Sequence, residues 1–148
     1  MKSIADQTSR EELIARINAL NDDCKAQWGK MSVFQMLKHC TLWEEMRSGT
    51  LPVKRVFIGR IIGKLLLKQE LSSDKPMAKN NPTVPELMTA ERVGDIISEK
   101  QKWIDLINKN ATTNSTQFIH PFFGKMTDEQ VGYQHYKHVD HHLRQFGC

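Results

Sequence analysis

The sequence has little cysteine and no long apolar run. Its three cysteines, Cys24, Cys40 and Cys148, are widely spaced and odd in number, and none forms a CxxC pair. We therefore expect neither a disulfide framework nor a thiolate metal site. The N-terminal residues lack the apolar core of a signal peptide, and no stretch of about 18 apolar residues could span a membrane. These absences predict a cytoplasmic protein with reduced thiols.

Charge of one sign is not concentrated either. The formal net charge is +4 over 148 residues, and no dense block of Lys and Arg is interleaved with aromatics. Nucleic acid is therefore not an expected partner, whereas mild basicity suits a small anionic ligand. The length and the hydrophobic content of 39% predict a single globular domain covering residues 1–148.

Helical spacing of apolar residues runs through most of the chain. Capping boxes predict three helix starts: Ser9 with Glu12, Ser32 with Gln35, and Thr127 with Gln130. Thr89 should cap a further helix that runs to about Asn108. Its inward stripe is Val93, Ile96, Ile97, Trp103, Ile104 and Ile107. No strand-like alternation and no repeat is found. The pattern predicts an all-α fold, a four-helix bundle with an additional helical and loop excursion around residues 52–88.

The excursion begins with a segment, residues 52–68, that is both apolar and basic. Pro52 fits the first turn of a helix. A basic amphipathic helix can lie on a membrane surface. Here, however, apolar residues on more than one face favour packing on two sides. A homodimer contact would then cover the second apolar face. Gly59 and Gly63 form a GxxxG spacing, a weak signal outside a membrane. Residues 70–88 carry three prolines and predict a lid or a wall of a functional site.

Four of the six histidines fall within eight residues: His135, His138, His141 and His142. His138 and His142 are four apart, so a helix places them on one face, where both can reach one metal ion. The apolar neighbours direct His135, His138 and His142 inward and leave His141 to one side. For one inward histidine a hydrogen-bonded core role is the simpler interpretation, but an inward HxxxH pair makes metal binding an equal alternative.

His39 is the candidate third ligand, because it borders the inward stripe of the predicted second helix. Three imidazoles from two helices leave a coordination position open, which favours substrate binding over a structural role. The HxxxH pair lacks the glutamate of metalloproteases, and Asp140 should project away from it, so peptidase chemistry is not expected. The catalytic group stays open, with His135, His141 and His120 as candidates beside a metal-activated water.

Two motifs carry a resemblance to a known family. The chain has HPFFGKMT from His120 to Thr127 and YKHVDHHLRQFG from Tyr136 to Gly147. They resemble the DinB/YfiT-like superfamily of metal-dependent helical-bundle enzymes, and within it a bacterial branch of unknown function with HPxFGxLT followed by YxHxDHHLRQFG. Residues 28–39 and 79–83 resemble the same branch. After His142 the chain continues with Leu143-Arg144-Gln145, whereas the more common ending in this superfamily is H-x-x-x-H-R-G-Q.

The resemblance implies an up-down-down-up four-helix bundle that holds a divalent metal through His39, His138 and His142. Zinc or nickel would be the metal, with iron or manganese as alternatives. The implied activity is that of a thiol-dependent S-transferase or a hydrolase acting on a small molecule, with a low-molecular-weight thiol as co-substrate. The alternative is a non-catalytic bundle that binds a metal or a ligand.

Overall fold

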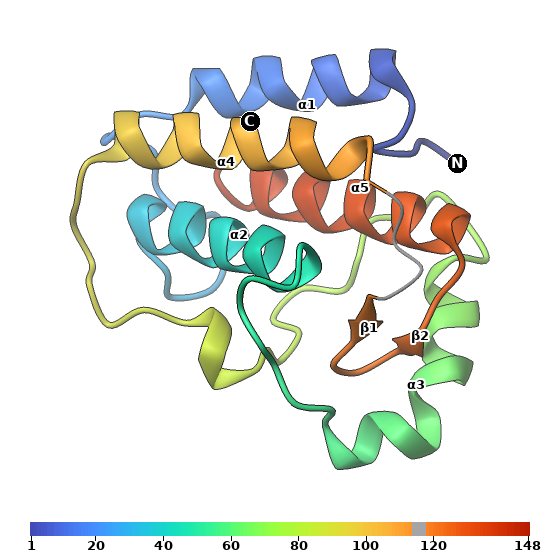
Figure 1. Cartoon of the computed structure of the whole chain (residues 1–148). Coiled ribbons are helices and arrows are strands. Elements are labelled where there is room, and N and C mark those ends of the chain that lie inside the picture. The colour runs from blue at the N-terminus through green and yellow to red at the C-terminus, as the bar shows by residue number, and fades with distance from the viewer. Residues whose placement is uncertain (114–117) are drawn as a thin grey trace.

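A computed structural model describes residues 1–113 and 118–148, and these residues are mostly helical (Figure 1). The helices are α1 (Gln7–Ala19), α2 (Val33–Arg47), α3 (Phe57–Glu70), α4 (Ile96–Ala111) and α5 (Asp128–Gln145), with a 3₁₀ turn η1 (Pro85–Leu87) and two short strands, β1 (Ile119–His120) and β2 (Gly124–Lys125). Helices α1, α2, α4 and α5 lie side by side, while α3 and the two strands lie at one edge (Figure 1). The predicted all-α class is confirmed, and the up-down-down-up order stays a prediction.

Helix α5 is buried on nearly all sides, because α1 covers the face opposite the histidines. The Asp140 side chain is only 12% exposed, and its carboxylate accepts hydrogen bonds from Arg16 Nη1 at 2.8 Å and Arg144 Nε at 2.7 Å. Asp140 projects away from the HxxxH face and toward α1, so this side of α5 is buried as well. A charged residue here is tolerated because two guanidinium groups satisfy it.

Two of the three predicted capping boxes are confirmed. Ser32 with Gln35 opens α2, and Thr127 with Gln130 opens α5, with both reciprocal hydrogen bonds formed. The box expected at Ser9 is wrong. Asp6 caps α1 three residues earlier, and its carboxylate accepts the Ser9 backbone N–H at 2.8 Å. An ionised acceptor at the N-terminus also interacts favourably with the helix dipole.

The start of α4 was also misplaced. Asp95 is its N-cap, not Thr89, and its side chain accepts the Ser98 backbone N–H. Val93 therefore precedes the helix and is 84% exposed, and Ile97, in the first turn, is 79% exposed. Both were expected on the inward stripe. The other four residues of the predicted stripe are confirmed, because Ile96, Trp103, Ile104 and Ile107 form the buried face of α4.

Helix α3 packs against a hairpin that the sequence did not predict. The two strands pair Ile119 with Lys125 and His120 with Gly124, too short a pairing to show an alternating pattern. Residues 52–56 are not helical, and the Val56 N–H donates to the Pro121 carbonyl, so α3 begins later than Pro52. A Cβ added at Gly59 or Gly63 would overlap the Phe122 carbonyl oxygen. The GxxxG spacing is thus a close backbone contact within the chain.

We expect Gly63→Ala to lower the free energy of unfolding by about 1–3 kcal/mol, because the added methyl group must displace the Phe122 backbone. Urea unfolding measures the effect. The matched control is Lys68→Ala on the exposed side of the same helix, which should change stability by less than about 0.5 kcal/mol. Equal stability of the two variants would contradict the close contact.

No disulfide forms among the three cysteines. None of the helices in residues 1–113 and 118–148 has the length and hydropathy that a bilayer crossing requires.

Candidate metal centre

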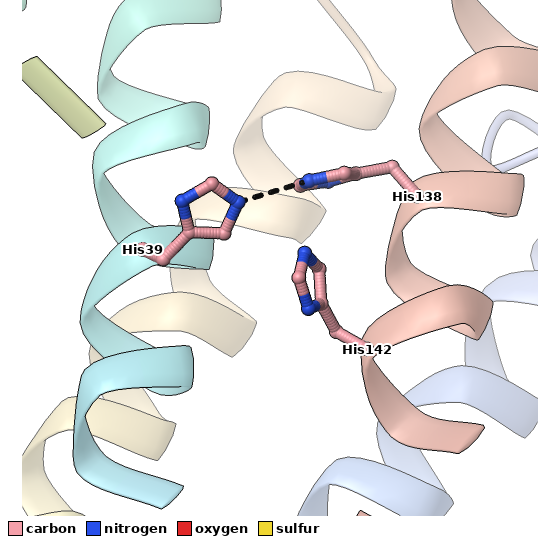
Figure 2. Close-up of side chains that lie close together, drawn as sticks. All are labelled: His39, His138 and His142. Atoms are coloured by element: carbon pink, nitrogen blue, oxygen red, sulfur yellow. Dashed lines mark hydrogen bonds between the residues drawn. The ribbon is translucent and has the colours of Figure 1, made fainter. Parts of the chain in front are cut away.

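Three histidines meet between α2 and α5. His39 comes from α2, and His138 and His142 come from α5; their rings point toward one another (Figure 2). One nitrogen from each ring lies within 4.8 Å of the others, and His39 Nε2 is 3.2 Å from His138 Nε2. All three residues are at most 8% exposed. The structure thus brings together the three residues that the sequence singled out.

A backbone carbonyl fixes the tautomer of His39. Its Nδ1 lies 2.9 Å from the carbonyl oxygen of Leu87, at the end of η1. A carbonyl oxygen only accepts, so Nδ1 must carry the proton and Nε2 of the neutral ring presents a lone pair toward His138. Holding one ring nitrogen as a donor to oxygen is how metal-ligating histidines are oriented in proteins.

A side-chain amide fixes the tautomer of His142 in the same way. Gln145 Nε2 donates to the carbonyl oxygen of Trp28 at 2.9 Å, so Gln145 must turn its Oε1 toward His142 Nδ1, 3.0 Å away. Nδ1 of His142 is therefore the donor, and its Nε2 is left with a lone pair. Two of the three rings thus present a bare Nε2, as a metal site requires.

Burial keeps the three rings neutral. It lowers the pKa of His39, and it lowers the pKa values of His138 and His142 well below the ordinary histidine value. Repulsion among the neighbouring imidazoles adds to the effect for His138 and His142. Because a metal binds the neutral form of histidine, the site is in the ligating state near neutral pH.

The fourth inward histidine, His135, belongs to a separate buried network. Its Nε2 lies 2.5 Å from Glu44 Oε1, and both side chains are at most 1% exposed. The other carboxylate oxygen of Glu44 accepts a hydrogen bond from Asn110 Nδ2 at 2.8 Å. The Trp43 ring contacts both His135 and His138, with centroid distances of 4.4 and 5.2 Å. Through Trp43, the network therefore packs against His138 of the three-histidine cluster.

His141 lies beside the histidine cluster, at the wall of a surface pocket. Its ring centroid is 5.1 Å from that of His142 and 5.6 Å from the Trp28 ring. The pocket has a volume of about 430 Å³, and its lining residues are Trp28, Pro76, Met77, Lys79, His141, Arg144, Gly147 and Cys148. The structure thus places His141 to one side of the three-histidine cluster, as its position on the helix indicates. Residues 76–79 form part of this wall, and their role as a lid stays a prediction.

His120 serves the hairpin turn. Its Nδ1 accepts the backbone N–H groups of Phe122 and Phe123 at 3.1 and 3.2 Å, and its ring stacks on Phe123. Burial, aided by the positive charge of Arg55, lowers the pKa of His120 to about 4. The structure places it outside the three-histidine group.

Several residues that shape the site were missed from the sequence. Glu44 is four residues after Cys40, on the inward stripe of α2, and a carboxylate at a core position indicates a buried partner. Gln145 lies one turn after His142, a spacing at which side chains meet. The carbonyl groups of Leu87 and Trp28 had no sequence signal, because any residue type supplies a carbonyl.

Three converging histidines in a helical protein, two of them with a fixed tautomer, define a class with a potential metal centre. Within that class, the chain belongs to the family described as "Protein of unknown function (DUF1569)", whose model matches residues 4–147. No curated protein and no solved structure matches the chain.

Proposed function

We propose that this protein is a metal-dependent enzyme of the DinB/YfiT-like type that acts on a small molecule. His39, His138 and His142 would hold one divalent metal, zinc or nickel before iron or manganese. Imidazole suits zinc, nickel and iron, whereas manganese prefers oxygen ligands. The observation that carries the proposal is the pair of bare Nε2 atoms fixed by Leu87 and Gln145. Without a cation, His138 Nε2 would have to donate its proton to His39; a metal takes the place of that proton.

The ligand set determines what the site can do. When bound, the metal supplies Lewis acidity that makes a nearby water or thiol a stronger acid. Three neutral imidazoles leave the positive charge of the metal uncompensated, and no carboxylate belongs to the described cluster. Such a site attracts an anionic reactant, which supports transfer of a low-molecular-weight thiol or hydrolysis of a small substrate.

The pocket beside His142 is the proposed substrate site. Lys79 places positive charge on its wall, with its ammonium 4.4 Å from the Trp28 ring centroid, whereas Arg144 on the same wall is paired with Asp140. Of the three candidate proton-transfer groups, His141 is the one that lines this pocket, while His135 and His120 are hydrogen-bonded elsewhere. We therefore assign binding of an anionic small molecule to this wall, and proton transfer to His141.

The activity is tested with metal-loaded protein, a panel of low-molecular-weight thiols with electrophiles, and a panel of small esters. Turnover that is lost on chelation and in His138→Ala, and that is reduced in His141→Gln with an altered pH profile, is the expected result. Metal binding without any turnover in either panel would leave a non-catalytic metal-binding bundle and overturn the enzymatic proposal.

Gln145 should act as a positioning residue for His142. We expect Gln145→Leu to weaken metal binding about 10–100-fold, because His142 Nδ1 loses the acceptor that orients the ring. Gln145→Glu is the matched control. It keeps an acceptor for His142 but loses the donation to the Trp28 carbonyl, so metal affinity should be retained. Competition with a chromophoric chelator measures both, and equal losses would show that Gln145 acts only through Trp28.

A further inference from the structure

Helix α3 exposes its large apolar side chains and buries its small ones. Phe57 is 76% exposed, Ile61 and Leu65 are each 67% exposed, and Ile58 is 49% exposed. The buried positions are Gly59, Gly63 and Leu67. A surface helix of a globular protein ordinarily does the reverse. Exposed apolar side chains grouped on one helix face indicate an interaction surface.

The contact with the hairpin explains the orientation of α3. Gly59 and Gly63 sit directly on the backbone of Phe122, where no larger residue fits. The helix cannot rotate its apolar side chains toward the protein without driving a Cβ into that backbone. Phe57, Ile61 and Leu65, four residues apart, are therefore held outward along one stripe.

A basic strip runs along the edge of this apolar stripe. Arg60, Lys64 and Lys68 are also four residues apart, and all are exposed. The Lys64 ammonium donates to the Lys125 carbonyl, which places its charge on the hairpin side of the stripe. Between residues 51 and 69 the chain has no aspartate or glutamate. The exposed face of α3 thus carries apolar and positively charged side chains, and no negatively charged ones.

We propose that the outer face of α3 docks the protein on the surface of a membrane that contains anionic lipids. Apolar side chains would enter the boundary between headgroups and acyl chains, and the flanking cations would meet lipid phosphates. The helix lies at the edge of the molecule, away from α1 and α4, so a flat surface can reach it (Figure 1). A second copy of the chain fits less well, because two such faces would oppose cation to cation.

Sedimentation of the full chain with lipid vesicles tests this assignment. The wild type should sediment with vesicles of phosphatidylcholine and phosphatidylglycerol at low ionic strength, and far less with phosphatidylcholine alone. Combining Ile61→Ser with Leu65→Ser, or Arg60→Gln with Lys68→Gln, should reduce the partition coefficient at least about tenfold. The four positions are exposed, so both variants should keep the wild-type circular dichroism spectrum.

The matched control combines Val93→Ser with Ile97→Ser, which removes exposed apolar side chains elsewhere. It should bind vesicles like the wild type. The proposal is overturned if the wild type does not sediment with anionic vesicles at low ionic strength. It is also overturned if the control loses as much vesicle binding as the variants of α3. It is also overturned if light scattering shows a dimer that the Ile61→Ser and Leu65→Ser pair dissociates while vesicles are not bound.

Discussion

Replacing Glu44 by alanine is expected to lower the free energy of unfolding by about 3–5 kcal/mol, because removing one partner of a buried pair leaves the other unsatisfied. Glu44 accepts hydrogen bonds from His135 and Asn110, and its side chain is 1% exposed. The substitution leaves both donors buried without an acceptor. Urea unfolding followed by circular dichroism measures the loss.

The neighbouring Glu45 supplies the control. Glu45 pairs with Lys102 at 2.6 Å, but the two side chains are 24% and 47% exposed. Surface pairs of this kind contribute at most about 1 kcal/mol, so Glu45→Ala should unfold close to the wild type. If Glu44→Ala and Glu45→Ala were equally stable, the buried network would have no structural role.

Acid should destabilise the fold through His120. Its pKa is lowered from 6.5 to about 4, so the unfolded state binds more protons than the folded state between these values. The stability contributed by neutral His120 is present in full above pH 6.5 and is lost as the pH falls toward 4. Between pH 7 and pH 5 the loss amounts to about 2 kcal/mol.

The variant His120→Asn isolates this contribution. An asparagine oxygen can accept the Phe122 N–H as the imidazole does, and it does not titrate. Free energies of unfolding at pH 7 and pH 5 are compared for both proteins, since the two proteins differ only at position 120. The wild type should lose about 2 kcal/mol more than His120→Asn. Parallel pH profiles would show that the His120 ring is protonated in the folded protein at pH 5.

The helices and the three-histidine cluster could be read from the sequence because both follow from periodicity. The four-residue spacing of His138 and His142 fixes a shared face, and the inward stripe of α2 directs His39 toward it. The helix ends were less reliable. Asp6 and Asp95 are the caps in place of Ser9 and Thr89, because several acceptors compete at each end and tertiary contacts select among them.

The remainder depends on contacts between distant parts of the chain. The Leu87 carbonyl lies 48 residues from His39 in the sequence and contacts its ring, and Glu44 contacts His135, which is 91 residues away in the sequence. Which face of α3 is buried was also not readable, because its apolar residues surround much of the helix. The close approach of Gly63 to Phe122 decides it.

The metal content of protein purified without a histidine tag tests the central claim most directly. Elemental analysis should find about one divalent transition metal per chain in the wild type, and at most about a tenth of that in His138→Ala folded to the same extent. After chelation, the wild type should take up about one equivalent again, and the variant should not. An absence of metal in both proteins after loading, or an equal content in both, would contradict a metal centre at His39, His138 and His142.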